Sequence, residues 1–145
     1  MREEFILAFE TGLNKLRNEV EEYASDEAFW SIPDGVANSA GNLCLHLLGN
    51  LNHYVGAKLG ETGYVRDRPS EFSSKDVARD EILQKIDQTI ATVKESLVNA
   101  DLAAEYPNDE GEEQRGVGGE LLRIVTHLNY HLGQINYHRR LISRK

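Results

Sequence analysis

Two histidines, His127 and His131, lie four residues apart in a segment with helical periodicity. At this spacing two side chains project from the same face of a helix, with Cβ atoms about 5–6 Å apart. Two imidazole nitrogens in this arrangement can bind one divalent ion at about 2.0–2.1 Å. A pair alone is a weak signal, because half-buried histidines reach the same spacing by chance. A metal site therefore requires a third ligand.

His46 is the best candidate for the third ligand, since Leu43 and Leu47 flank it on the apolar side of an earlier helical segment. A lone histidine there is more often a core residue, and the case for His46 depends on the pair. The pair itself borders an apolar stripe centred near Leu128 and Ile135. At such a border the packed core fixes the ligand side chains, and one side of the metal site stays open to solvent.

The remaining histidines compete for the same roles. His53 follows His46 by seven residues, and His138 follows His131 by seven. Seven residues are two helical turns, or about 10 Å along the axis, which one ion cannot span. We therefore interpret His53 and His138 as solvent-facing or pocket-rim residues.

Four long helical segments must position these side chains, and they span about residues 2–23, 36–59, 75–100 and 117–142. Each carries apolar residues at alternating spacings of three and four, which predicts an amphipathic helix. The apolar residues of the third segment, for example, are Leu83, Ile86, Ile90, Val93 and Leu97. Ser73 or Ser74 could cap that helix, and Gly60 could end the second.

No segment shows the alternation of a β-strand, so we predict an all-α fold in a single domain covering residues 1–145. The expected connectors are Ser25 to Gly35, Glu61 to Ser73 and Asp101 to Gly116, and each contains one of the three prolines. Connectors of this length are long for a simple up-and-down bundle, and they permit a crossover between parallel helices.

The net charge of −8 comes from 24 acidic and 16 basic residues. An acidic chain is poorly suited to polyanions, which argues against nucleic-acid binding. The single cysteine, Cys44, lies in an apolar run and is expected to be a buried, inert thiol. The start of the chain lacks a signal-peptide pattern, and no apolar stretch approaches 18 residues. We therefore expect no membrane partner and a cytoplasmic location.

The segment 38–47 resembles the second-helix motif of the DinB/YfiT-like superfamily, in which Asn-Ser precedes a single histidine in an apolar helix. The segment 127–135 is similar to the last-helix motif, a histidine pair followed by Arg-Gly-Gln-Ile, with Leu132 in place of the arginine. Trp30 and Pro33 match a tryptophan–proline loop before the second helix. The runs 49–51 and 66–72 point to a little-characterised branch.

The resemblance covers nearly the whole chain. It implies a four-helix bundle with a crossover connection, a metal held by His46, His127 and His131, and often a homodimer. Members include thiol S-transferases that use low-molecular-weight thiols and a mycothiol-dependent isomerase. A substrate contact made by the usual arginine does not carry over to Leu132.

A metal-dependent enzyme of the thiol S-transferase or hydrolase type is the first functional hypothesis. Three imidazoles leave one open position on tetrahedral zinc, or up to three on octahedral nickel, manganese or iron. Of these ions we expect zinc or nickel first, with manganese or iron as alternatives. A low-molecular-weight thiol is the expected partner of a transferase. Residues expected to line the substrate pocket are Asn50, Tyr54, Tyr130 and Gln134.

The alternative is a non-catalytic metal-binding or stress-related dimeric bundle protein, or a remnant that has lost its metal. Open coordination positions facing a cleft favour catalysis, whereas a filled, buried coordination sphere favours a structural ion. For the homodimer, apolar residues beside the main stripes, such as Leu7, Leu45 and Leu48, are candidates for the interface.

Overall fold

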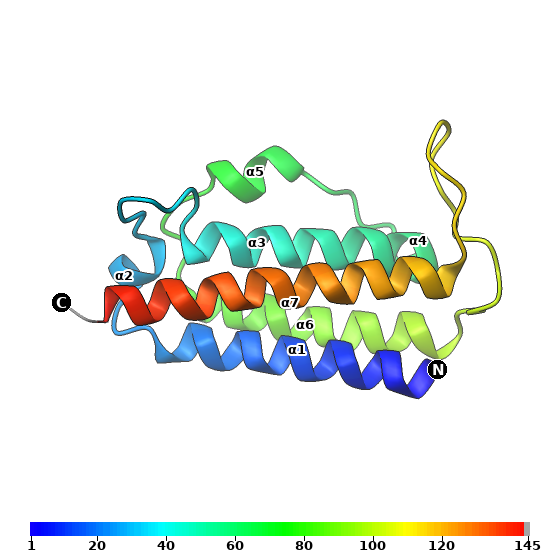
Figure 1. The fold of residues 1–145 in the computed structure, drawn as a ribbon, viewed down its shortest axis with the longest axis horizontal. Coiled ribbons are helices and arrows are strands. Elements are labelled where there is room, and N and C mark those ends of the chain that lie inside the picture. The colour runs from blue at the N-terminus through cyan, green and yellow to red at the C-terminus, as the bar shows by residue number, and fades with distance from the viewer. Residues whose placement is uncertain (144–145) are drawn as a thin grey trace.

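A computed structural model describes residues 1–143 of the chain, and Figure 1 shows their arrangement. Four long helical rods form a bundle. They are α1 (Arg2–Glu22), α3 (Ala40–Leu51) with its continuation, α6 (Arg79–Val98) and α7 (Val117–Ile142). The continuation of α3 consists of a π-helical segment, η1 (Asn52–Ala57), and one short turn, α4 (Lys58–Gly60). Two further short helices are α2 (Asp26–Trp30) and α5 (Arg68–Ser73).

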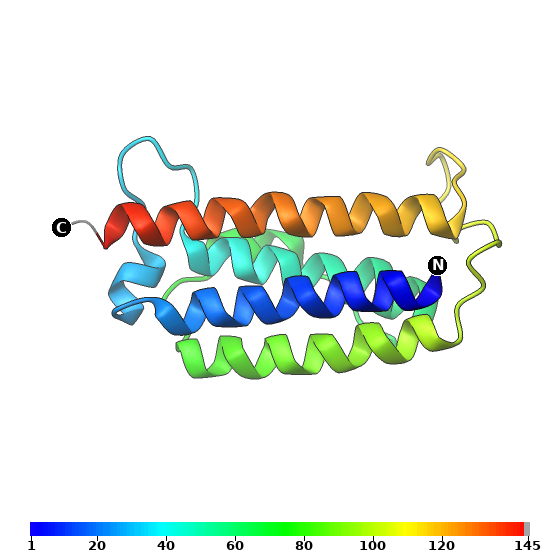
Figure 2. The same cartoon turned by 60° about the horizontal axis from the view of Figure 1, so that its bottom comes forward.

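The rods α1 and α7 run in one direction along the bundle, and α3 and α6 run in the other (Figures 1 and 2). Because α3 and α6 are parallel, the chain between them must return along the whole length of the bundle. Residues 61–78 form this crossover, which carries α5 across the outside of α3. The predicted four-helix bundle with a crossover connection is therefore confirmed. The described residues contain no β-strand beyond one isolated bridge between Glu105 and Gly116.

The apolar stripes of the sequence form the core. In the predicted segment 2–23, the apolar residues that recur at spacings of three and four are all buried: Phe5, Phe9, Leu13, Leu16, Val20 and Tyr23. In α6 the stripe is displaced, because Ile82 is buried whereas Leu83 and Ile90 are only partly buried against the core. Cys44 is fully buried, as predicted, and burial raises the pKa of its thiol. The thiol is therefore protonated and shielded from solvent at neutral pH.

The expected connectors contain structure that the hydrophobic pattern did not predict. The Ser25 hydroxyl accepts a hydrogen bond from the Ala28 amide and caps α2. Asp67 caps α5 in the same way, with Pro69 in the first turn where proline is tolerated. The expected serine cap of α6 is wrong. That helix begins at Arg79 after Ala78, and Ser74 instead ends α5.

None of the helices in residues 1–143 combines the length and apolar character that a membrane-spanning helix needs.

Candidate metal centre

The start of α3 is fixed by an Asn-Ser pattern whose role is structural. The Ser39 hydroxyl accepts from the Asn42 amide at 3.0 Å and donates to the Asn42 side-chain oxygen at 2.7 Å. The Asn42 side-chain nitrogen donates to the backbone oxygens of Glu71 and Ser74, at 2.9 and 2.8 Å. These bonds cap α3 and also fasten α5 of the crossover onto it.

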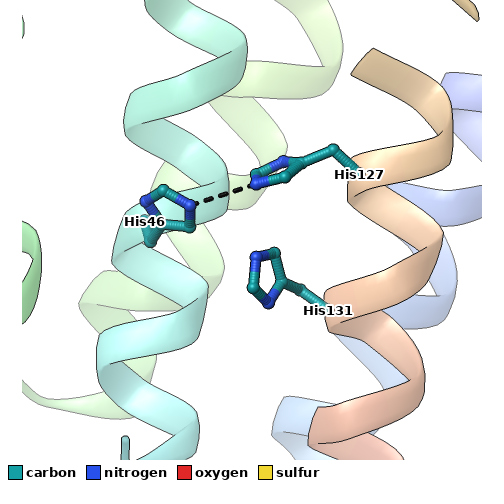
Figure 3. A group of neighbouring side chains, drawn as sticks. All are labelled: His46, His127 and His131. Atoms are coloured by element: carbon teal, nitrogen blue, oxygen red, sulfur yellow. Dashed lines mark hydrogen bonds between the residues drawn. The ribbon is translucent and has the colours of Figure 1, made fainter. Parts of the chain in front are cut away.

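The structure brings together the three histidines that the sequence singled out. His46 on α3 faces His127 and His131 on α7, and Figure 3 shows their rings turned towards one another in the gap between the helices. One ligand atom from each residue lies within 4.8 Å of the other two. His46 is buried, whereas His127 and His131 are half-buried. The cluster therefore has a closed side on α3 and a more open side on α7.

The distance between two of the ring nitrogens suits a common ion. His46 Nε2 lies 3.1 Å from His127 Nε2. Two ligands bound at about 2.0–2.1 Å and subtending an angle between the octahedral and tetrahedral values lie about 2.8–3.4 Å apart. The observed separation falls within this range, so these two nitrogens fit one divalent ion.

Hydrogen bonds to the outer nitrogens fix the tautomers of two rings. The Nδ1 atom of His46 lies 3.0 Å from Glu71 Oε1, and that of His131 lies 2.7 Å from Gln134 Oε1. A carboxylate oxygen and an amide oxygen only accept, so each Nδ1 carries the proton. Each Nε2 is left with a lone pair, which is the state a metal ligand needs.

His127 is the ring whose outer nitrogen lacks such a partner. In residues 1–143, two buried side-chain polar atoms have no hydrogen-bond partner, His127 Nδ1 and Asn50 Oδ1. Asn50 lies one turn after His46 on α3. Buried polar atoms of this kind usually have a partner, and the Asn50 oxygen is therefore an acceptor available to a bound molecule. His127 Nδ1 is the outer nitrogen of its ring, so an ion between the Nε2 atoms would not satisfy it. The fit to a divalent ion rests on the three converging imidazoles and on the distance between two of their Nε2 atoms.

The surroundings of His46 and His127 favour the neutral form of these two rings. Burial, followed by the neighbouring His131 and His46, lowers the pKa of His127 to about 4, and Arg123 and Arg66 act in the same direction. Burial also lowers the pKa of His46, although the hydrogen bond to Glu71 opposes it. Neutral imidazoles are available to bind a metal without first losing a proton.

The four predicted pocket residues lie around the histidines in different settings. Asn50 is buried, and Gln134 is exposed and bonded to His131. Tyr130 is 65% exposed, with its ring 5.2 Å from that of His131. Tyr54 lies on η1 between two guanidinium groups, Arg66 at 5.9 Å and Arg123 at 5.2 Å from its ring centroid. That these four residues contact a substrate remains a prediction.

Sequence reasoning missed Glu71 and Arg66. Arg66 Nε and Nη2 each lie 2.9 Å from an oxygen of Glu71, and Glu71 in turn contacts His46. Both residues fall in the segment expected to be a connector. Pro69, which follows a capping Asp67, was the available signal for a short helix there.

His138 is not solvent-facing, which corrects our interpretation of the sequence. It is 3% exposed, and its Nε2 donates to the Ser31 carbonyl at 2.9 Å. Its Nδ1 therefore carries the lone pair and accepts from the Tyr23 hydroxyl at 2.7 Å. His138 also belongs to the lining of a cleft of about 350 Å³, together with Leu43 and Tyr137. His53 is half-buried at η1 and lies outside the three-histidine cluster.

We expect His138 to make the metal-free protein less stable in acid. Burial lowers its pKa below the ordinary 6.5, so the unfolded chain binds more protons than the folded chain below about pH 6.5. The stability that the neutral His138 ring contributes is fully present above that pH. It is lost as the pH falls towards the folded-state pKa, and the free energy of unfolding then decreases by at most about 1.4 kcal/mol per pH unit. Urea unfolding of chelator-treated protein at about pH 7.5 and 5.5 measures it. His138→Gln should lose less stability between the two pH values than wild type, and equal losses would contradict the prediction.

The comparisons with known proteins identify a family but no activity. A family model described as a protein of unknown function, DUF1572, matches residues 2–145. No curated protein and no solved structure is significantly similar to the chain.

Proposed function

We propose that this chain, which belongs to the DUF1572 family of proteins of unknown function, is a divalent-metal-binding bundle of the DinB/YfiT-like kind that acts as a metal-dependent transferase or hydrolase. The observation that carries the proposal is the convergence of His46, His127 and His131 from two helices, with ligand atoms within 4.8 Å of one another. The short Nε2–Nε2 distance and the two fixed tautomers support it.

A divalent ion held by three neutral imidazoles supplies a Lewis acid that makes a thiol or a water molecule nucleophilic near neutral pH. The chain's own residues prepare the site for such an ion. Glu71 and Gln134 each hold the outer proton of one imidazole and so direct the lone pair of its Nε2 inwards. Zinc and nickel are the ions we favour.

Residues beside the cluster could bind and orient a substrate. Asn50 Oδ1 is a buried acceptor without a partner and could take a hydrogen bond from a bound molecule. The exposed ring of Tyr130 and the half-buried ring of Tyr54 could cover apolar parts of it. Because His127 and His131 are half-buried, a small reactant could reach the cluster from the α7 side.

A non-catalytic metal-binding protein is the second candidate, and one observation favours it. The cleft of about 440 Å³ between α3, the crossover and α6 is lined by residues such as Leu48, Tyr64 and Thr89 and by none of the three histidines. A structural or sensed ion needs no cleft for a substrate. The homodimer expected from the superfamily resemblance is a proposal that suits either candidate.

Cobalt substitution tests the proposal and separates the two candidates. We expect purified, chelator-treated protein to take up about one equivalent of Co²⁺ with the absorption spectrum of a nitrogen-ligated ion. Adding a small thiol should change that spectrum if a coordination position is open, as a transferase requires. Uptake without a response to thiols would favour the non-catalytic candidate, and no stoichiometric uptake of cobalt, zinc or nickel would overturn both.

A further inference from the structure

The crossover places the buried carboxylate of Glu71 beside His46, on the α3 side of the histidine cluster. Glu71 on α5 is 5% exposed, and its Oε1 accepts the Nδ1 proton of His46 at 3.0 Å. A buried carboxylate is costly unless charged or polar partners compensate it. The residues around Glu71 provide this compensation.

Arg66 provides the opposite charge from the same crossover. Its guanidinium group contacts both oxygens of Glu71, with Nε and Nη2 each at 2.9 Å. Its Nη2 also lies 3.4 Å from His46 Nδ1, but the guanidinium only donates and its short bonds are those to Glu71. Arg66 therefore holds the carboxylate in one orientation and leaves the bond to His46 intact.

The sequence of α3 leaves room for this carboxylate. Gly49 lies about one turn after His46, and a Cβ at this position would overlap the Glu71 carboxyl group. Asn42, about one turn before His46, holds the backbone of Glu71 and of Ser74. The turns of α3 before and after His46 thus both contact the same segment of the crossover, α5.

We propose that Glu71 is a positioning residue of the metal centre, so that metal affinity depends on the docking of the crossover onto α3. The inference rests on the proposed metal-binding function. A carboxylate that accepts the outer proton of a ligating imidazole fixes the ring and makes its other nitrogen a stronger donor. By linkage, an ion bound to His46 must in turn stabilise the docked crossover.

The chain contains a matched control for Glu71. Glu120 on α7 is also buried and is held by two arginines, Arg115 and Arg123. No hydrogen bond connects it to a histidine among the described residues. Glu120→Gln therefore removes a buried, paired carboxylate without removing the partner of a ligand.

Zinc affinity, measured by competition with a chromophoric chelator, tests the proposal. We expect Glu71→Ala and Gly49→Ala to weaken binding about 10–100-fold, the usual cost of losing an outer partner of a metal ligand. Glu71→Gln should lose less, because its amide oxygen can still accept the proton. Glu120→Gln and Gly119→Ala should bind as wild type, since a Cβ at Gly119 meets no atom within 4 Å.

Hydrogen exchange provides a second measurement that does not depend on activity. Zinc should slow amide exchange across residues 66–74 in wild type, and this protection should be absent in His46→Ala. Gly49→Ala retains the carboxylate and so remains informative if Glu71→Ala fails to fold. Wild-type zinc affinity in folded Gly49→Ala, and in Glu71→Ala where it folds, with no protection of residues 66–74, would overturn the role of Glu71 and leave the proposed function standing. A wild-type protein that binds no metal would overturn both.

Discussion

Alanine at His131 is expected to remove most of the metal that the protein binds. The substitution leaves two of three imidazoles, and the remaining pair lies on different helices. We expect affinity to fall by more than the roughly 100-fold that the loss of an outer partner can cost. Metal content per chain after reconstitution with zinc or nickel and gel filtration measures this. His127→Ala should behave in the same way.

His53→Ala is the matched control for this experiment. His53 is half-buried, and its ring packs against Tyr54 at 4.7 Å outside the cluster. This variant should retain the wild-type metal content. Thermal unfolding gives an independent measurement, because free metal at about 100 times its dissociation constant adds about 2.7 kcal/mol of stability to a protein that binds it. Equal metal content in wild type and His131→Ala would refute the site.

Truncating Leu128 is expected to cause the largest loss of stability among the substitutions considered. Leu128 is fully buried on α7, between the positions of His127 and His131. It packs closely on α1, where a Cβ at Gly12 would lie only 2.8 Å from Leu128 Cδ2. A Leu→Ala change in such a core costs about 2–5 kcal/mol, because it leaves a cavity that the helices cannot close.

Urea unfolding of the metal-free protein measures this loss. Leu122→Ala, on the same helix and 60% exposed in wild type, is the control and should change stability by no more than about 0.5 kcal/mol. Metal affinity should also fall in Leu128→Ala, since the turn that carries both histidines loses its support. A loss of less than about 1 kcal/mol would show that the bundle repacks around this position.

The four long helices and the histidine pair on α7 could be predicted because each depends on a pattern within one segment. The stripe from Phe5 to Tyr23 identifies the buried face of α1 without reference to any other helix. The spacing of His127 and His131 identifies a shared face of α7 in the same way. The choice of His46 followed from its apolar neighbours and was supported by the superfamily resemblance.

The surroundings of the cluster could not be predicted, because they depend on contacts between distant segments. Glu71 lies 25 residues after His46, and nothing in the local sequence indicates that the crossover returns at this point. His138 is followed by Arg139 and Arg140, as is typical of an exposed helix end, yet Tyr23, 115 residues earlier, provides a buried partner. The change from α- to π-helix at Asn52 also left no mark in the hydrophobic pattern.

The helices that carry the histidines are far apart along the chain. His46 and His127 are separated by 81 residues, and this stretch includes the crossover and all of α6. A bond between two such points reduces the freedom of the unfolded chain, and for a permanent cross-link around a loop of this length the chain-entropy model gives about 4.5 kcal/mol. The chain has a single cysteine and cannot form an internal disulfide. A bound ion would therefore serve as a removable cross-link, and the stability that it adds would follow the supply of the ion and not the redox state of its surroundings.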